Sequence, residues 1–274
     1  MKFSVSLCVY GGDDPIYFER ALDSVFLQSR KPDEVVLAVD GPISIEHEKV
    51  IEKYNTYPIF KVVRLEENKG HGEARRLTVS NCTMPIIAIM DSDDIALPDR
   101  FEKQIAIFEQ NQDIDLCGGQ IEEFIGDESN IIDKRSVPEK EEDIVKYMKY
   151  RCPFNQQTVA FKREMYDKAG GYLDWHLEED YYLWVRMYLC GAKFINLPDT
   201  LVLVRMSADS YKRRGGWKYY KSEKSFQKYL LKHGIISRWQ YTCNVFKRFV
   251  VQVLMPGRVR SFVFKKFARE KAGK

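Results

Sequence analysis

Three aspartates fall within four residues in the segment Asp91-Ser92-Asp93-Asp94. Carboxylates this close together repel one another, and a divalent cation would neutralise them. Oxygen ligands favour a hard ion such as Mg²⁺ or Mn²⁺, which uses few protein carboxylates and takes its remaining ligands from substrate phosphate and water. The alternative is a solvated turn that caps a helix beginning near Pro98. The spacing alone leaves both interpretations open.

A second acidic group, Glu178-Glu179-Asp180, stands near the start of a helix predicted over residues 177–190. Acidic side chains in a first helical turn interact favourably with the helix dipole, so simple capping explains them. The functional alternative is a general base. A sugar hydroxyl is a poor nucleophile, and a positioned carboxylate can accept its proton.

The segment from Asn68 to Arg76 (NKGHGEARR) joins a predicted strand to a predicted helix. Its two glycines would let the backbone approach a ligand, and Arg75 could meet a phosphate. The segment has neither a Walker pattern nor GxGxxG, so a glycine-rich helix start is the alternative. His71 has no partner at metal-ligand spacing, and we interpret it as a surface or structural residue.

These motifs sit within an alternation of short apolar runs and longer amphipathic runs. The apolar runs predict strands at residues 3–10, 34–40, 59–65, 85–90 and 114–125, and the amphipathic runs predict helices at 15–28, after Ser44, and at 69–81 and 98–111. The alternation predicts a mostly parallel α/β sheet covered by helices on both faces. Asp40 and Asp91 end two of the strands, so we expect both at the carboxyl edge, where such sheets bind ligands.

The rest of the chain is less regular. Residues 126–140 are polar and predict a loop, residues 139–150 predict a helix, and residues 151–206 mix short strands with the helix at 177–190. After Gly215-Gly216 the chain becomes helical and basic. We therefore expect one domain over residues 1–210, with halves at about 1–112 and 113–210, and a basic helical region over residues 211–274.

Charge divides the chain at nearly the same point. Residues 1–200 contain 24 Lys and Arg against 37 Asp and Glu, a net charge of −13, whereas residues 201–274 contain 19 against 3, a net charge of +16. In the tail, Val259, Phe262, Val263 and Phe267 share one helical face. A basic amphipathic helix suits an anionic membrane surface. The alternative is that this face packs on the acidic body.

Two further patterns bear on location. The six cysteines are scattered and form no CxxC pair, which argues against a zinc site and fits a reducing compartment. The amino-terminal segment does not have the pattern of a signal peptide, and no apolar stretch is long enough to span a bilayer. We expect a cytoplasmic protein, peripheral on the inner face of the plasma membrane.

Taken in order, the motifs resemble those of the inverting family 2 glycosyltransferases of GT-A fold, of the type that builds amylovoran, other exopolysaccharides and O-antigen. The resemblance covers about residues 3–220. It is carried by VSLCVYGGDDPIYFERALDSVFLQSRKPDEVVLAVDGP, NKGHGEARRLTV, IMDSDDIALPDRFEKQ, CPFNQQTVAFKRE, AGGY and EEDYYLWVRM.

The resemblance implies a role for each matching position. On the nucleotide side it implies that Asp40 contacts the uracil or its ribose, that Asp91 supports the ribose and the metal, and that Asp93 binds a Mn²⁺ or Mg²⁺ ion that bridges the diphosphate. The same side includes Val9, Tyr10, Arg75 and Ser92. Asp180 is implied as the base that activates the acceptor hydroxyl. The acceptor side includes Asn155, Gln157, Gly171 and Glu179.

Two departures from the family pattern stand out. The second strand ends in one aspartate, Asp40, where relatives often have two. Ser207 lies in a late segment where many relatives carry a histidine that helps bind metal, and Arg213 with Arg214 could hold the diphosphate instead. The QxxRW motif of processive synthases is absent, which indicates transfer of a single sugar.

The implied reaction moves a hexose from a UDP-sugar, with inversion, to a saccharide acceptor carried on a polyprenyl diphosphate. The same sequence features leave room for a sugar nucleotidyltransferase or for a catalytically silent sugar-nucleotide-binding module. We expect no nucleic-acid partner, although salt-dependent nucleic-acid binding by the basic tail is a third possibility.

Overall fold

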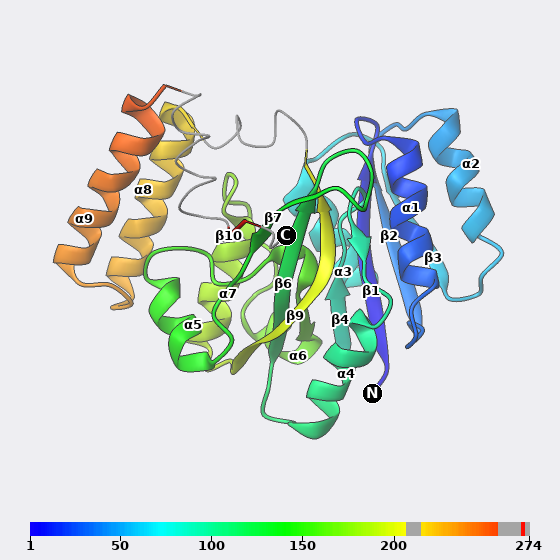
Figure 1. The fold of residues 1–274 in the computed structure, drawn as a ribbon, viewed down its shortest axis with the longest axis horizontal. Coiled ribbons are helices and arrows are strands. Elements are labelled where there is room, and N and C mark those ends of the chain that lie inside the picture. The colour runs from blue at the N-terminus through cyan, green and yellow to red at the C-terminus, as the bar shows by residue number, and fades with distance from the viewer. Residues whose placement is uncertain (207–214, 257–269, 272–274) are drawn as a thin grey trace.

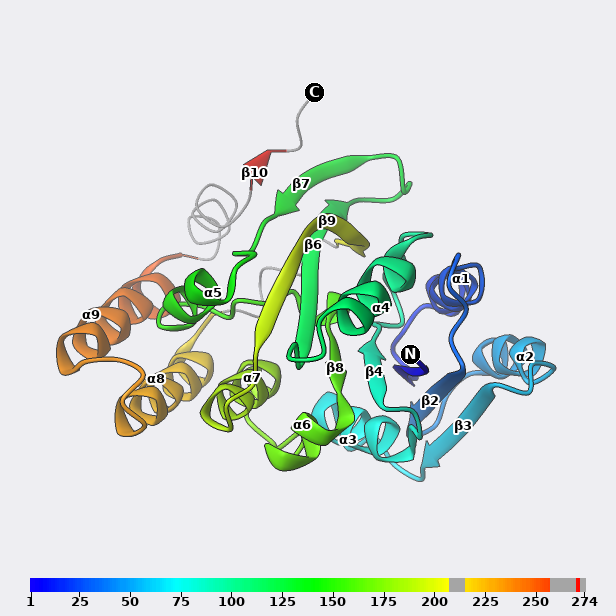
Figure 2. The same cartoon turned by 90° about the horizontal axis from the view of Figure 1, so that it is seen from below.

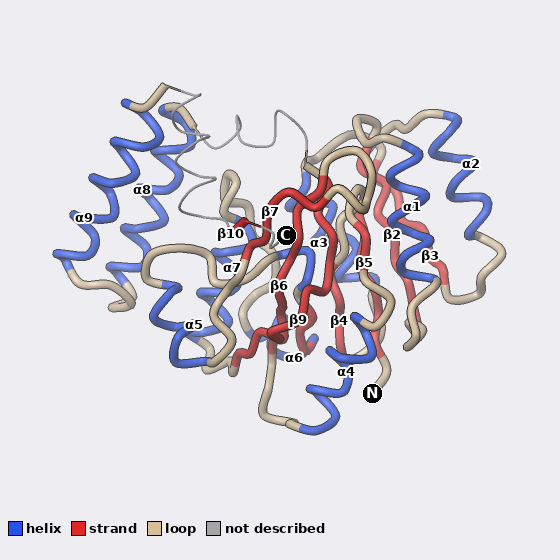
Figure 3. The backbone as a smooth tube through the Cα atoms, in the orientation of Figure 1, coloured by secondary structure: helices blue, strands red, loops and turns tan. Residues whose placement is uncertain are grey.

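The computed structural model describes residues 1–206, 215–256 and 270–271. Within these residues one ten-stranded sheet forms the centre of the molecule (Figures 1 and 3). Its strands are β1 (Phe3–Tyr10), β2 (Glu34–Asp40), β3 (Phe60–Leu65), β4 (Ile86–Ile89), β5 (Ile95–Ala96), β6 (Leu116–Phe124), β7 (Ile131–Arg135), β8 (Ala160–Lys162), β9 (Phe194–Arg205) and β10 (Glu270–Lys271).

The helices surround this sheet. They are α1 (Pro15–Phe26), α2 (Ile45–Tyr54), α3 (His71–Asn81), α4 (Arg100–Gln110), α5 (Glu141–Met148), α6 (Arg163–Lys168), α7 (Glu179–Leu189), α8 (Trp217–Lys232) and α9 (Arg238–Phe249), with a 3-10 turn at Gln156–Thr158 and a π-helical turn at Val250–Leu254.

The sheet is parallel in its first part and mixed in its second. Strands β3, β2, β1 and β4 lie side by side in parallel, with Tyr10 level with Asp40. Beyond β4 the next neighbour, β8, is antiparallel, and β6 then pairs antiparallel with β7 and β8 but parallel with β9. The predicted α/β class is confirmed, and the parallel arrangement is confined mainly to the first ninety residues.

Helices cover both faces of the sheet (Figure 2). Strand β2 shows why, because its alternating side chains enter two different cores. Val35 and Leu37 pack with Phe18 of α1 on one face. Val36 faces the other way, into the core that contains Trp184 of α7. A strand buried on both sides is therefore apolar at every position, as EVVLAVD nearly is.

The predicted elements agree well with the structure, with helix ends differing by one or two residues. Ser44 caps α2 as expected, since its hydroxyl accepts from the His47 amide at 3.4 Å. The loop predicted for residues 126–140 was wrong, because it contains β7. Every residue of β7 is only partly buried, so the strand lacks the apolar pattern that identifies buried strands. Its pairing with β6 defines it instead.

Helices α8 and α9 lie side by side beyond α7 at one end of the molecule (Figure 1). Phe226 and Leu230 of α8 are fully buried in the same core as Trp184. The boundary expected near residue 210 thus separates regions of opposite charge that share a hydrophobic core. No helix in the described ranges is both long and apolar enough to cross a membrane.

Glu34, the first residue of β2, ties three segments together at the opposite end of the strand from Asp40. Its side chain is 2% exposed and accepts hydrogen bonds from the Ser4 hydroxyl at 2.5 Å and the Thr83 amide at 2.7 Å, and it pairs with Lys61 at 2.5 Å. Burial opposes the charge, but these donors outweigh it and lower the pKa of Glu34.

We predict that Glu34→Ala lowers the free energy of unfolding by about 1–3 kcal/mol, because it leaves buried donors without an acceptor. Urea denaturation of the variant and of the exposed control Glu52→Ala would measure the difference. Since folding lowers the pKa of Glu34, its contribution is fully present above the ordinary value of 4.5 and is lost as the pH falls through the lowered value. Equal stability of both variants at pH 7 would contradict this assignment.

Candidate active site

Asp40 and Asp91 both lie at the carboxyl edge of the parallel strands, as expected from the sequence. Asp40 is 4% exposed, and its carboxylate accepts from the backbone amides of Lys69 at 2.7 Å and Gly70 at 3.0 Å. The next residue, Gly41, has φ of 82°, and a Cβ there would lie 2.5 Å from the Asn68 amide nitrogen. Asp40 therefore holds the loop that leads into α3, and its contact with a nucleotide stays a prediction.

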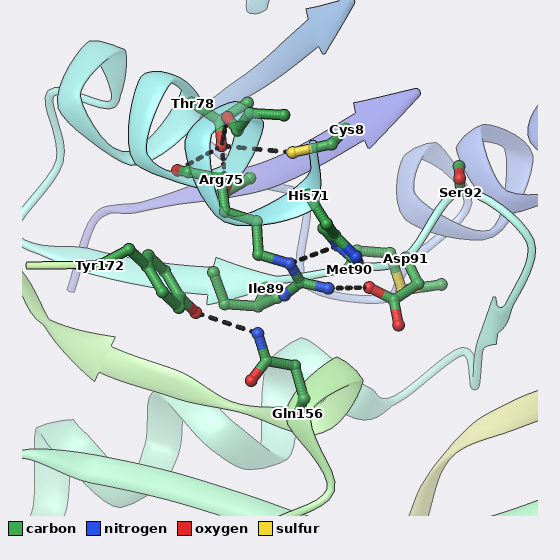
Figure 4. Close-up of polar contacts among 12 residues, drawn as sticks. Cys8, His71, Arg75, Thr78, Ile89, Met90, Asp91, Ser92, Gln156 and Tyr172 are labelled. Carbon is green, nitrogen blue, oxygen red and sulfur yellow. Dashed lines mark hydrogen bonds and ion pairs between the residues drawn. The ribbon is translucent and has the colours of Figure 1, made fainter. Parts of the chain in front are cut away.

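Helix α3 carries Arg75 beneath this edge (Figure 4). The guanidinium is almost fully buried and donates to Asp91 Oδ1 at 2.5 Å and to His71 Nε2 at 2.5 Å. Burial disfavours its charge, but Asp91, together with smaller contributions from Tyr172, Cys8 and Glu179, outweighs this and raises the pKa of Arg75. His71 thus has the structural role expected of it, because it helps orient Arg75.

The remaining residues of the aspartate segment point in different directions. Ser92 donates to Asp13 Oδ2 at 2.7 Å. Asp94 is buried and accepts from the backbone amide of Arg205, the last residue of β9, at 2.9 Å. Asp93 is exposed. Ser92 and Asp94 therefore hold the loop that contains Asp13 and the end of β9 in place, while the carboxylate of Asp93 faces solvent.

The exposed carboxylate of Asp93 lies in a negatively charged environment. Partial desolvation by the surrounding protein, followed by repulsion from Asp91 and Asp13, raises its pKa to about 6. Burial likewise raises the pKa of Asp13, with a further contribution from Asp91. Carboxylates that raise one another's pKa in this way fit a divalent cation, which would relieve the repulsion. Among the described residues, no group of three or more His, Cys, Asp or Glu is arranged to hold a metal ion.

The acidic residues at the start of α7 face the start of α3. A Cβ added at Gly72 would lie 3.9 Å from the Glu179 side chain. Burial, and then repulsion from Asp180, raises the pKa of Glu179 to about 7, and the nearby Arg75 partly opposes this. Asp180 Oδ1 accepts from the Tyr181 amide at 2.6 Å. The fold thus brings the acidic start of α7 against the glycine-rich start of α3, which lies far from it in the sequence.

Gln156, in the 3-10 turn, connects these motifs. Figure 4 draws its amide nitrogen toward the Tyr172 hydroxyl, 3.1 Å away, which leaves its oxygen facing acceptors only. With the amide turned over, the oxygen accepts from Arg75 and from Tyr172, and the nitrogen donates to Asp180 Oδ2 at 3.1 Å. This orientation satisfies both ends of the amide, and we adopt it.

The other residues expected on the acceptor side occupy supporting positions. Asn155 has no exposed surface, and its amide nitrogen donates to the Gly119 carbonyl at 2.8 Å. Gly171 has φ of 63° and lies against the Tyr166 ring, which a Cβ would approach to 2.9 Å. Gln157, next to the bridging Gln156, is partly exposed. This geometry supports a structural role for Asn155 and Gly171, and direct contact with an acceptor stays a prediction.

On the nucleotide side, Val9 is buried in the core, whereas the neighbouring Tyr10 is exposed at the edge of the sheet. The residues expected to complete the site from the late loop, Ser207, Arg213 and Arg214, lie outside the described residues. The apolar tail face of Val259, Phe262, Val263 and Phe267 also lies outside them.

Sequence reasoning missed several residues of the site. Asp13 carries a detectable signal, because it follows the first strand at the carboxyl edge in the GGDD loop. Gln156 lies beside the chosen Gln157. Tyr172 ends the AGGY segment, but no role was assigned to it, and Arg205 had no local signal because its contacts are made across the fold. The Arg205 guanidinium, for example, stacks 3.8 Å from the centre of the Tyr17 ring.

The start of α7 is also joined to the carboxyl-terminal helices. The Tyr219 hydroxyl of α8 lies 3.2 Å from both Glu178 Oε1 and Glu223 Oε1. Arg248 of α9 pairs with Glu223. Burial, and then repulsion from Glu223, raises the pKa of Glu178. A buried polar cluster therefore connects α8 and α9 to the residue that precedes Glu179.

Comparison with known proteins gives this geometry a context. The model of the family "Glycosyl transferase family 2" matches residues 4–170. The chain is 39% identical to an uncharacterised glycosyltransferase of Haemophilus influenzae, over 81% of this chain and 83% of that protein. It is 35% identical to the UDP-Gal:alpha-D-GlcNAc-diphosphoundecaprenol beta-1,3-galactosyltransferase of Escherichia coli, over 98% and 97% of the two chains. It is 34% identical to the amylovoran biosynthesis glycosyltransferase AmsE of Erwinia amylovora, over 96% and 98%.

Solved structures share the fold at low sequence identity. Staphylococcus aureus TarS 1–349 in complex with UDP-GlcNAc superposes with a TM-score of 0.68 at 17% identity, over 91% of this chain and 73% of that one. The mannosyltransferase PcManGT of Pyrobaculum calidifontis, in complex with GDP-Man and Mn²⁺, gives a TM-score of 0.62 at 14% identity, over 97% and 75%. The chain therefore belongs to glycosyl transferase family 2 and is a glycosyltransferase of GT-A fold.

Proposed function

We propose that this enzyme transfers a hexose from a UDP-sugar, with inversion, to a saccharide carried on a polyprenyl diphosphate. The observation that carries the proposal is the continuous contact from Asp91 through Arg75 and Gln156 to Asp180, which brings a donor-side carboxylate and a candidate base into one site. The name of the E. coli relative supports the substrate classes, because that protein matches along nearly its whole length. Membership of glycosyl transferase family 2 argues against the alternative of a sugar nucleotidyltransferase.

The donor side of the proposed site lies at the carboxyl edge of β1, β2 and β4. Asp93 and Asp91 would hold a Mn²⁺ or Mg²⁺ ion, and when bound this ion would offset the charge on the departing UDP. Val9, Tyr10, Asp40, Arg75 and Ser92 would form the nucleotide side. The exposed position of Asp93 and the crowding of carboxylates around it support this assignment.

Asp180 would act on the acceptor side. It accepts the proton of the acceptor hydroxyl as the oxygen attacks the anomeric carbon from the face opposite UDP. An α-linked donor then gives a β-linkage, which agrees with the linkage in the name of the E. coli relative. Glu179 would border the acceptor, while Asn155, Gln157 and Gly171 would shape its side of the site.

We predict that Asp180→Asn lowers kcat by about 10²–10⁴-fold, because the amide cannot accept the proton. Release of UDP and formation of the glycoside, followed with a panel of UDP-sugars, would measure the loss. The thermal midpoint should match that of the wild type, and the exposed control Asp167→Asn should retain full activity. Wild-type turnover by Asp180→Asn would remove Asp180 from the mechanism.

A second prediction concerns the metal. Chelation with EDTA should abolish transfer, and Mn²⁺ or Mg²⁺ should restore it. Asp93→Ala should require at least about tenfold more metal for half-maximal rate, because it removes a ligand. Asp113→Ala, an exposed change elsewhere, should respond to metal as the wild type does. Undiminished activity in EDTA would exclude the metal role.

We further propose that the basic region, residues 211–274, holds the enzyme at the inner face of the plasma membrane. In the described part of this region, α8 carries five exposed lysines that recur on one helical face (Lys218, Lys221, Lys224, Lys228 and Lys232). On α9, Trp239 is 75% exposed and Phe246 is 64% exposed. Exposed lysines and exposed aromatic residues are both features that suit an anionic lipid surface.

The same lysine face borders a shallow depression next to the loop that precedes α7. The depression has a volume of about 380 Å³ and is lined by Asp174, Trp175, His176, Lys218, Lys221, Ser222 and Ser225. Because residues 174–176 lead into the helix that carries Asp180, we propose that the lipid-linked acceptor docks from this side.

We predict that the triple variant Lys221→Glu, Lys224→Glu and Lys228→Glu loses affinity for anionic vesicles by at least about 10²-fold, because each lysine near the surface contributes about 1 kcal/mol. Sedimentation with phosphatidylglycerol vesicles would measure binding, and phosphatidylcholine vesicles would give the baseline.

A matched control reverses the charge of three exposed lysines outside the basic region, with the changes Lys2→Glu, Lys49→Glu and Lys146→Glu. It has the same net charge as the test variant and should retain vesicle binding. Equal loss in both variants would assign the effect to net charge. Unchanged binding of the test variant would mean that this face of α8 does not contact lipid.

A further inference from the structure

The side chain of Gln156 lies between two groups of opposite charge. On one side its amide oxygen accepts from the buried guanidinium of Arg75, which is itself paired with Asp91. On the other side its amide nitrogen donates to Asp180 Oδ2 at 3.1 Å. A neutral amide can satisfy both partners at once, because it combines an acceptor and a donor in one plane.

The surroundings of Gln156 define its orientation. The Tyr172 hydroxyl, 3.1 Å away, donates to the same amide oxygen. Tyr172 is 1% exposed, and burial raises its pKa, so it remains a neutral donor. With Arg75 and Tyr172 both donating, the amide oxygen must face them and the nitrogen must face Asp180.

The backbone of Gln156 is held equally firmly. The 3-10 turn Gln156–Thr158 closes with a hydrogen bond from the Thr158 amide to the Asn155 carbonyl at 2.9 Å. The Thr158 hydroxyl accepts from the Gly119 amide of β6 at 3.1 Å, and Asn155 donates to the Gly119 carbonyl. The turn is therefore fixed to the central sheet, and Gln156 has a fixed base from which to reach α3 and α7.

We propose that Gln156 is a positioning residue that orients the carboxylate of Asp180 relative to the donor side of the site. This inference rests on the proposed function, because it assumes that Asp180 is the base. Gln156 acts through Asp180 and does not itself exchange a proton. Its loss therefore lowers turnover and has little effect on donor binding.

The first test compares Gln156→Leu with the wild type, using UDP release and product formation. We expect kcat to fall by about 10²-fold, as for small misplacements of a reacting group. The KM for the UDP-sugar should change by less than about threefold, because the donor contacts remain. Gln110→Leu, an exposed glutamine at the end of α4, is the matched control and should be fully active.

The second test uses Gln156→Glu, which keeps the shape of the side chain and the acceptor for Arg75. A carboxylate there cannot donate to Asp180 unless it is protonated, so the substitution places a second acid directly beside Asp180 and couples the titration of the two. We expect the acidic limb of the kcat–pH profile to move upward by about one pH unit or more. Among the described residues, the titratable groups that interact with Asp180 include Cys152, Tyr172, Glu178 and Glu179, and Arg75 faces it through Gln156.

The outcomes separate the inference from the proposed function. Wild-type kcat in Gln156→Leu, a loss confined to KM, or an unshifted pH profile in Gln156→Glu would each overturn the role of Gln156. Absence of transfer by the wild-type enzyme with every UDP-sugar tested would instead overturn the proposed function. A thermal midpoint for Gln156→Glu close to that of the wild type shows that a shifted profile does not arise from unfolding.

Discussion

The ion pair between Arg75 and Asp91 is the interaction on which the site depends. A guanidinium with only a few per cent of its surface exposed would be strongly destabilising without a partner of opposite charge. Asp91 supplies that charge, while His71 and Gln156 each accept a further hydrogen bond from the guanidinium. Because Arg75 sits on α3 and Asp91 ends β4, the pair fixes the helix against the strand edge. Asp40 strengthens this arrangement by holding the loop at the start of α3.

The carboxylates of the site are divided between anchoring and reaction. Asp40, Asp94 and Asp13 use their oxygens to accept from backbone amides or a hydroxyl, and so hold loops in place. Asp93 is exposed and stands among like charges. This division explains how an acidic cluster can be stable before any cation binds. Most of these carboxylates accept hydrogen bonds from neighbouring groups. The electrostatic repulsion is concentrated at Asp93, where a bound cation would relieve it.

The carboxyl-terminal helices are structurally continuous with the site even though their charge sets them apart. Phe226 and Leu230 share the core of α7, and the cluster of Glu178, Tyr219, Glu223 and Arg248 joins all three helices. Helix α8, whose exposed lysines we propose to face lipid, is thereby packed through its buried face against the helix that carries Asp180.

The sequence by itself determined the parallel half of the sheet, the carboxyl-edge position of Asp40 and Asp91, and the acidic start of α7, because apolar periodicity and strand ends are local properties. It could not identify β7, whose pairing with β6 is its main support, or the bridging role of Gln156. The resemblance assigned the metal to Asp93 and not to Asp94, but the exposure of Asp93 and the burial of Asp94 could not be read from the sequence. Only the tertiary structure decided these points, because burial and hydrogen bonding depend on which distant segments of the chain the fold brings into contact.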